Sequence, residues 1–247
     1  MQPPGSLFPF PSIRRPASWL ALILCLPLCQ CAARPLPAEK KTPLPASAMA
    51  RWQRVTPRLA AAVPRDRNDR PIDWKFIVVP AKGRNARSLP SGRVEVTEGM
   101  LTFVRTDGEL AAVLAHEMSH VTLRHGIARS MASWGVILGG AALAVLAHHH
   151  GGSGGWEAAG MGTAAVFTVS LTGLTAYQRS QEFAADTESV ALLLRAGYPA
   201  RSAADFWELY TGGRRAEGRT GGGWWKSHPS DAERVQRLRA LAGKHGS

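Results

Sequence analysis

The pattern of apolar and polar positions in the first part of the chain predicts one helix and a small sheet. Residues 49–63 carry apolar side chains at helical spacing and end before a proline, which cannot continue a helix. Residues 72–79 are rich in β-branched and aromatic side chains and also stop at a proline, which is typical of a strand. Residues 92–96 are a second, short strand candidate, and residues 85–90 are predicted to be a loop or an irregular edge.

A capping box at Thr106 and Glu109 predicts where the next helix begins. The threonine hydroxyl and the glutamate carboxylate can each accept a hydrogen bond from the other residue's free backbone N–H group. Apolar residues continue at helical spacing from Leu110 to Val121, so we expect this helix to run towards Arg129.

Two apolar stretches, residues 131–147 and 158–177, predict a helical hairpin. Three histidines and a glycine-rich segment separate them, which favours a flexible tip. The first stretch is at the lower limit of the length that spans a bilayer, and its glycines weaken it further. A hairpin that is buried or rests on a membrane is therefore favoured over two membrane spans.

The C-terminal part of the chain predicts three more helices. A polar helix over residues 178–196 is closed by Gly197, and a short helix follows over residues 202–210. Residues 214–223 are predicted to be a Gly/Arg loop. A second capping-box pattern begins a final helix over residues 230–243. The whole pattern predicts an α+β fold that is mainly α-helical.

The N-terminal residues 1–33 have the pattern of an export signal. Arginines precede an apolar run that is too short to span a bilayer, and small residues follow it. All 3 cysteines lie in this segment, so we expect no disulfide and no thiolate metal site in the folded domain. Cys31 is the best candidate for lipid attachment, although the residue before it departs from the lipobox pattern. Residues 34–48 predict a Pro-rich tether, 49–243 a folded domain and 244–247 a tail.

Composition and charge narrow the class of protein. The chain has 247 residues, of which 45% are hydrophobic and 19% charged, which excludes a disordered or fibrous protein. Lys and Arg outnumber Asp and Glu by 30 to 18, a net charge of +12 that suits nucleic acid, anionic lipid or acidic substrates. No nucleic-acid recognition motif accompanies this charge, so we expect no nucleic-acid partner.

The segment with the clearest chemical meaning is HEMSH, residues 116–120. His116 and His120 share one face of a helix, so both imidazoles can reach one metal ion. Glu117 lies next to them, where it can take a proton from a water that the metal acidifies. The alternative is a surface helix that carries two histidines by chance.

A catalytic zinc site needs a third protein ligand, and the downstream polar helix offers two candidates. Glu182 and Asp186 are spaced by four residues and share one face of that helix. Glu182 can be the third ligand, while Asp186 can accept the ring N–H of a ligating histidine. By themselves they would be an ordinary acidic face paired with Arg179. Together with HEMSH they predict a site for one zinc ion per chain.

Several further motifs stand in a fixed order along the chain. They are NA at 85–86, RHG at 124–126 after HEMSH, YQRSQEFAAD at 177–186, and SHP at 227–229 with Arg234. In order and spacing these motifs resemble the HtpX and type 1 CAAX prenyl protease group of membrane-associated zinc metallopeptidases. The resemblance covers residues 49–242 and is greatest to the small exported bacterial members.

The resemblance implies a zincin-type metallopeptidase with a HExxH helix, a second ligand helix and a small β-sheet. The implied zinc ligands are His116, His120 and Glu182. Glu117 would act as general base and general acid during hydrolysis.

The same resemblance implies roles for residues around the metal. Asp186 would be a partner of a metal ligand, and Arg234 would position this region through an ion pair. His228 corresponds to a family histidine near the metal that can assist the oxyanion or plug the resting site. Asn85 and Ala86 correspond to the substrate-binding edge.

These features predict an exported zinc endopeptidase of the bacterial cell envelope, in the periplasm or on the periplasmic face of the outer membrane. By family analogy, its substrates would be misfolded or unassembled envelope proteins, and a membrane surface would be a further partner. Arg87 replaces an aromatic or apolar residue common in the family, which points to acidic substrate side chains. The alternatives are an envelope chaperone or assembly factor closed by His228, a membrane-embedded protease, and a metal-free basic module.

Overall fold

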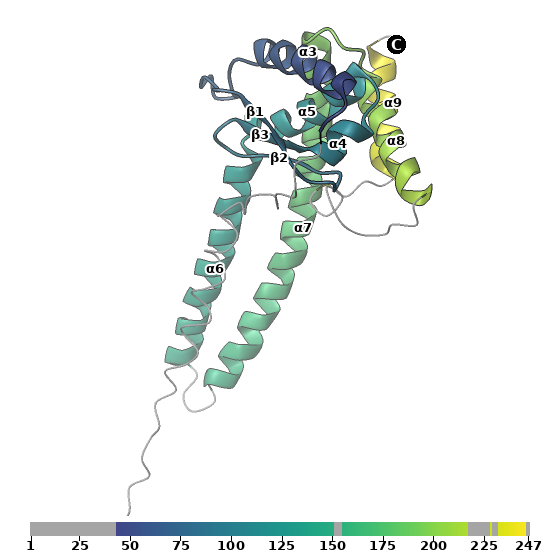
Figure 1. Cartoon of the computed structure of the whole chain (residues 1–247). Coiled ribbons are helices and arrows are strands. Elements are labelled where there is room, and N and C mark those ends of the chain that lie inside the picture. Colours follow the sequence, from purple (N-terminus) through teal and green to yellow (C-terminus); the bar gives the residue numbers. More distant parts are fainter. Residues whose placement is uncertain (1–42, 151–154, 217–227, 229–231, 246–247) are drawn as a thin grey trace, which may run out of the picture. The chain divides into compact units, whose positions relative to one another are not determined.

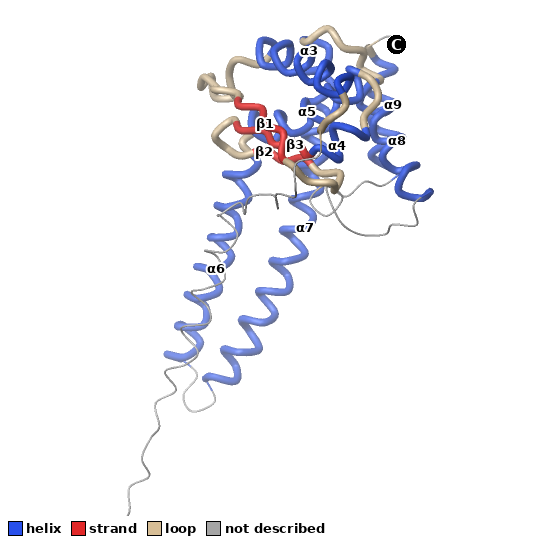
Figure 2. Tube along the Cα trace, viewed as in Figure 1, coloured by secondary structure: helices blue, strands red, loops and turns tan. Residues whose placement is uncertain are grey.

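The computed structural model describes residues 43–150, 155–216, 228 and 232–245. The elements in chain order are α3 (Ala46–Ala62), β1 (Lys75–Val79), β2 (Ala86–Ser88), β3 (Arg93–Thr97), α4 (Glu98–Phe103), α5 (Asp107–Thr122), α6 (His125–His150), α7 (Gly155–Arg195), α8 (Ser202–Ala216) and α9 (Ala232–Lys244) (Figure 1). Helices predominate and the strands form one small sheet, which confirms the predicted α+β class (Figure 2). The predicted export signal with Cys31 lies outside the described residues.

The sheet has the strand order β1-β3-β2, with β1 parallel and β2 antiparallel to β3. The strands predicted at 72–79 and 92–96 are therefore present as β1 and β3. The prediction of a loop or irregular edge at 85–90 was wrong in part, because Ala86–Ser88 form β2. This strand is too short to show alternation in the sequence, and its pairing with β3 decides its conformation. It is an edge strand of the described sheet.

The capping box is confirmed at the start of α5. The hydroxyl of Thr106 accepts the Glu109 N–H at 3.1 Å, and the Glu109 carboxylate accepts the Thr106 N–H at 3.3 Å. The expected continuation to Arg129 was wrong, because α5 ends at Thr122. Arg124 has a φ of 59°, in the left-handed region, so it interrupts the helix and α6 starts at His125 in a new direction.

Helix α5 forms the centre of the core. Every residue from Leu110 to Thr122 is buried, so both the apolar and the functional faces of the helix are covered. Leu59 of α3, Leu192 of α7 and Phe206 of α8 belong to the same buried cluster. A helix enclosed on all sides holds its side chains at fixed positions, which suits a site that needs defined geometry.

The predicted hairpin exists, but its arms are longer than the apolar stretches at 131–147 and 158–177. Helix α6 begins at His125, and α7 runs without a break into the predicted polar helix at 178–196. The two helices lie side by side (Figure 1). The C-terminal end of α7 was predicted correctly, since Gly197 follows it with a φ of 72°.

The exposed side chains of α6 argue against burial of the first arm of the hairpin. The side chains of Met131, Leu138 and Val145 are 69%, 64% and 57% exposed. The segment His125–Leu146 is long and apolar enough to cross a bilayer, and its most apolar part has no buried residue. The described part of α6 therefore presents an apolar surface that no other described part of the chain covers.

Three further boundaries differ from the predictions. Helix α3 begins at Ala46, inside the predicted tether, and α8 extends to Ala216, inside the predicted loop at 214–223. Residues 217–223 of that loop lie outside the described residues. Helix α9 ends at Lys244 and packs against α7 and α8, so the last helix belongs to the folded unit.

Candidate metal centre

Helix α5 places two imidazoles next to each other on one face. His116 and His120 are four residues apart, and their Nε2 atoms lie 3.2 Å from each other. Both side chains are buried. The helical spacing therefore produces the juxtaposition that the sequence predicted.

Helix α7 and the segment before α9 complete the cluster. Glu182 places its two carboxylate oxygens 3.3 Å from His116 Nε2 and 3.4 Å from His120 Nε2. His228 Nδ1 lies 2.9 Å from Glu182 Oε2 and 3.2 Å from His116 Nε2. One ligand atom from each of these four residues lies within 4.8 Å of the others. Imidazole nitrogens and a carboxylate are ligands that zinc prefers, so this donor set fits a zinc ion.

A buried ion pair contacts two of the predicted metal ligands. Arg234 of α9 donates to both oxygens of Asp186, at 2.8 and 2.6 Å, and its Nη1 lies 3.2 Å from Glu182 Oε2. Asp186 Oδ1 in turn lies 3.2 Å from His116 Nδ1. The Arg234 side chain is fully buried, with its guanidinium 4.2 Å from the ring centre of Trp207. Asp186 and Arg234 thus both lie next to the predicted ligands.

His125 is a residue of this site that reasoning from helix periodicity missed. Its Nδ1 lies 2.9 Å from Nδ1 of His120, so it holds the ring whose Nε2 faces the cluster. A spacing of five along one helix would point His125 elsewhere. The left-handed turn at Arg124 ends that helix and brings His125 back to His120. The RHG motif was the only sequence signal for this contact.

The carboxylate of Glu117 has a different partner on each oxygen. Ser88 Oγ donates to Oε2 at 3.1 Å, and His228 Nε2 lies 3.3 Å from Oε1. The Glu117 side chain is buried and belongs to the same helix as the two histidines. Ser88 was not singled out from the sequence, because a serine at the end of a short strand carries no motif.

Strand β2 links the predicted substrate edge to this carboxylate. Asn85 directly precedes the strand and its N–H donates to Thr97 Oγ1 at 2.9 Å, while Ala86 is the buried first residue of the strand. The strand ends at Ser88, which contacts Glu117. A polypeptide lying along β2 would therefore pass over the cluster.

The side chain of Arg87 lies on the face of β2 opposite to Ala86 and Ser88, because side chains alternate along a strand. Its guanidinium pairs with the buried carboxylate of Glu95 at 2.8 Å, and Arg93 contacts the same carboxylate at 2.7 Å. The charge of Arg87 is thus matched by Glu95, which argues against it as the source of an acidic substrate preference.

The charges in the cluster suit metal binding. Burial alone would raise the pKa of Glu182, but the charge and hydrogen bonds of His228 and His116 outweigh it and hold that pKa well below its usual range. Burial, together with the charges of His116 and His228, lowers the pKa of His120. Glu182 is therefore ionised and His120 neutral, which are the forms that bind a metal.

His116 differs, because it holds a proton in the metal-free site. Burial opposes its charged form, but contacts with Asp186 and Glu182 outweigh burial and raise its pKa to about 9. A metal must displace this proton in order to bind Nε2. The proton therefore competes with the metal below pH 9, and the competition grows as the pH falls.

We expect zinc binding at about pH 8 to release roughly one proton from His116. Calorimetric titration of the metal-free protein in buffers of different ionisation enthalpy measures this number. Asp186→Asn removes one of the contacts that raise the pKa of His116, so this variant should release fewer protons. Equal proton release by the two proteins at this pH would contradict the assignment.

Comparison with known proteins gives one family over most of the chain. The profile of peptidase family M48 matches residues 47–242. The metalloprotease LoiP of Escherichia coli K12 is 33% identical over 183 residues, which cover 73% of this chain and 67% of LoiP. This match is broader than the HtpX and CAAX prenyl protease group that the motifs resembled.

Two further relatives are matched over smaller parts of their lengths. The mitochondrial metalloendopeptidase OMA1 of Schizosaccharomyces pombe is 28% identical over 172 residues, 68% of this chain and 46% of OMA1. The β-barrel assembly-enhancing protease of Yersinia pestis is 27% identical over 141 residues, 54% of this chain. The matched part spans only 27% of the Yersinia protein's length.

Proposed function

Because the chain belongs to peptidase family M48 and is a zinc metalloendopeptidase, we propose that it hydrolyses misfolded or unassembled proteins in the bacterial cell envelope. The observation that carries this proposal is the buried cluster of His116, His120 and Glu182 beside the Glu117 carboxylate. The name of the Yersinia relative, which refers to β-barrel assembly, supports the choice of substrates. LoiP supports kinship with bacterial members of the family.

The N-terminal sequence supports a proposal for the location of the protein. We propose that residues 1–33 direct export to the periplasm or the periplasmic face of the outer membrane, with Cys31 as the candidate for lipid attachment. Residues 34–48 would serve largely as a tether to a domain at 49–243, with 244–247 as a tail. Among M48 peptidases we place the chain nearest the small exported members of the HtpX and CAAX prenyl protease group.

We assign zinc binding to His116, His120 and Glu182, whose ligand atoms already converge. When bound, zinc supplies a Lewis acid that acidifies water and polarises a substrate carbonyl. Asp186 fixes the ring of His116, His125 fixes the ring of His120, and both therefore orient ligands.

Glu117 moves the proton in the proposed hydrolysis. Its carboxylate takes a proton from the attacking water and passes it to the nitrogen of the leaving amine. Ser88 holds Oε2 through its hydroxyl, so Oε1 is the oxygen left to carry the proton once His228 moves away. An extended substrate would lie along β2, near Asn85 and Ala86, as an added strand.

We expect Ser88→Ala to lower kcat about tenfold, because a hydrogen bond to a charged group is lost from Glu117. KM for unfolded casein and the zinc content should stay within about twofold of wild type, since the substrate edge and the ligands are intact. Ser88→Thr keeps the hydroxyl and should restore most of the kcat. A threonine variant as slow as the alanine variant would refute a role for the hydroxyl.

The position of His228 supports a second candidate function, an envelope chaperone or assembly factor with a plugged zinc site. His228 contacts Glu182, His116 and Glu117 at once, so it lies between two of the proposed ligands and the proposed proton carrier. We expect His228→Ala to cleave casein faster if the plug limits turnover. It would be slower if His228 donates to the oxyanion.

The exposed face of α6 supports a membrane surface as partner. We expect wild type to bind vesicles that contain phosphatidylglycerol, and the double variant Leu138→Gln, Val145→Gln to bind about tenfold more weakly because apolar burial is lost. Leu194→Gln, at an exposed leucine of α7, is the control for loss of an apolar side chain. Flotation in a density gradient measures binding, and equal flotation of wild type and the double variant would contradict the assignment.

The test of the proposed function compares folding states of one envelope substrate. An outer-membrane β-barrel protein is offered either freshly diluted from urea or folded in detergent, with zinc-loaded enzyme. We expect cleavage of the unfolded form only, and none with Glu117→Gln. Faster folding of the barrel without cleavage would favour the assembly factor, and cleavage of both forms would refute selection for unfolded proteins.

A further inference from the structure

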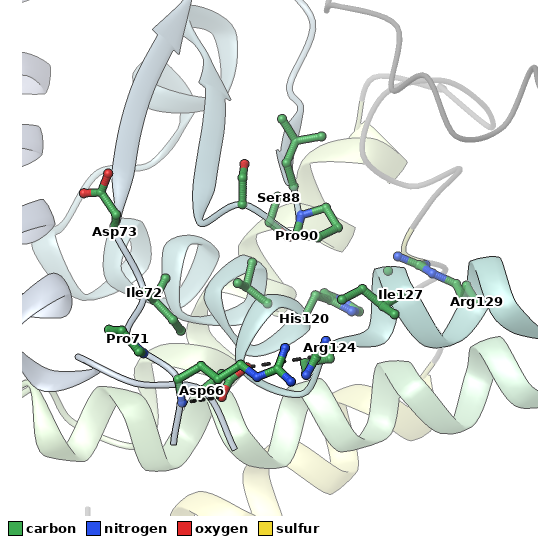
Figure 3. A pocket seen from close by; sticks show the side chains of 15 residues that line it. Asp66, Pro71, Ile72, Asp73, Ser88, Pro90, His120, Arg124, Ile127 and Arg129 are labelled. Atoms are coloured by element: carbon green, nitrogen blue, oxygen red, sulfur yellow. Dashed lines mark hydrogen bonds and ion pairs between the residues drawn. The ribbon is translucent and has the colours of Figure 1, made fainter. Parts of the chain in front are cut away.

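A pocket of about 270 Å³ adjoins the metal centre (Figure 3). Its walls come from the segment before β1, the end of β2, the end of α5 and the start of α6. Ser88 and His120 both line it, and Ser88 also contacts Glu117. The pocket therefore continues from the catalytic centre at the end of the strand along which a substrate would lie.

The two carboxylates of the pocket already have partners. Asp66 accepts the backbone N–H groups of Asn68 and Arg70, both at 2.9 Å, and lies 4.0 Å from Arg124 Nε. These hydrogen bonds hold the pKa of Asp66 below its usual value, so its carboxylate stays ionised and already has hydrogen-bond partners. Asp73 pairs with Lys75 at 3.1 Å. Neither carboxylate is left for a cationic ligand.

The guanidinium of Arg129 has no such partner. No carboxylate of the described residues forms an ion pair or hydrogen bond with it, although it lines the pocket from the first turns of α6. Figure 3 shows Arg129 beside Ile127, with Pro90 across the pocket. Arg70, which also lines the pocket, likewise forms no ion pair with a described carboxylate, so the net charge of the described lining is positive.

Part of the pocket wall is apolar and can pack against the aliphatic part of a substrate side chain. Ile72, Ile127 and Pro90 contribute apolar surface to the same pocket. A glutamate or aspartate side chain combines an apolar stem with a carboxylate, and guanidinium groups bind carboxylates through paired hydrogen bonds.

We propose that this pocket is a substrate subsite for an acidic side chain, with Arg129 as the residue that sets the preference. The proposal rests on the proposed peptide hydrolysis at Glu117 and assigns its sequence specificity. An acidic residue near the scissile bond would enter the pocket while the backbone lies along β2.

Two measurements test the proposal. Mass-spectrometric mapping of the sites cut in unfolded casein shows whether Glu and Asp are enriched at one position near the scissile bond. Fluorescence anisotropy then measures binding of a labelled peptide from one such site, and of its Glu-to-Gln analogue, to zinc-loaded Glu117→Gln. The variants are Arg129→Met and, as a control for net charge, Arg201→Met, at an exposed arginine directly before α8.

We expect wild type to favour acidic residues about tenfold, and Arg129→Met to lose most of this preference. Arg201→Met should behave as wild type. Cleavage without acidic enrichment, or a preference that survives Arg129→Met, would overturn the subsite and leave the proposed function intact.

The remaining outcomes of these experiments also support or overturn the proposed subsite. If casein is not cut, acidic and amide peptides of the same sequence are compared by binding alone. A Glu preference that depends on Arg129 then supports the subsite while the proposed hydrolysis fails. Weaker binding of Arg129→Met to anionic vesicles, with peptide binding unchanged, would overturn the subsite in favour of a lipid contact.

Discussion

Replacing Glu117 with glutamine is expected to reduce peptide hydrolysis by about 10³-fold while one zinc ion per chain stays bound. Glutamine keeps the size of the side chain but cannot take a proton from water and return it to the leaving amine. Because none of the assigned ligands changes, the loss should appear in kcat. Casein cleavage and zinc content measured on the same preparation check this expectation.

The structure makes this substitution mild in every other respect. Ser88 can donate to the amide oxygen of the new side chain as it does to Oε2 of Glu117. A matched control is Glu188→Gln on α7, where the carboxylate pairs with exposed Arg195. The control should keep full activity. A Glu117→Gln protein with more than about a tenth of wild-type activity would rule out Glu117 as the main proton carrier.

Replacing Arg234 with methionine is expected to lower the free energy of unfolding by about 3–5 kcal/mol. Arg234 is 1% exposed and bonds to the Asp186 carboxylate at 2.8 and 2.6 Å. Its loss leaves Asp186, and in the metal-free site also Glu182, as buried acids whose cationic partner is then only the protonated His116. Urea unfolding of the metal-free protein measures the change.

Two further variants distinguish the ion pair from simple packing. Arg239→Met, on the same helix, removes an exposed pair with Glu208 and should cost below about 1 kcal/mol. Combining Arg234→Met with Asp186→Asn should cost less than the sum of the two single changes, because the second removes the uncompensated charge. Additive losses would show that Arg234 contributes mainly through its contact with Trp207.

The features that could be predicted from the sequence are those that depend only on residue chemistry and on residues close together in the chain. The capping box at Thr106 depends on residues three apart, and the pairing of His116 with His120 depends on helical spacing. Glu182 and Asp186 lie on one face of α7 for the same reason. Such relations hold within one turn of backbone and need no tertiary information.

Contacts between distant segments required the fold. Ser88 meets Glu117 because β2 pairs with β3 beside α5, and His125 meets His120 because Arg124 adopts a left-handed conformation. The motifs predicted that His228 lies near the metal, but its simultaneous contacts with Glu182 and Glu117 appear only in three dimensions.

The sequence by itself predicted a mainly helical fold with a zinc site, because HExxH spacing and helix periodicity are local properties, and the resemblance of its ordered motifs implied a peptidase. The tertiary structure decided which side chains hold the ligands in place, and it showed that the apolar face of α6 lies outside the core. It also decided where the unmatched charge of Arg129 lies. These features arise from packing between segments far apart in the chain, and packing is set by the whole fold.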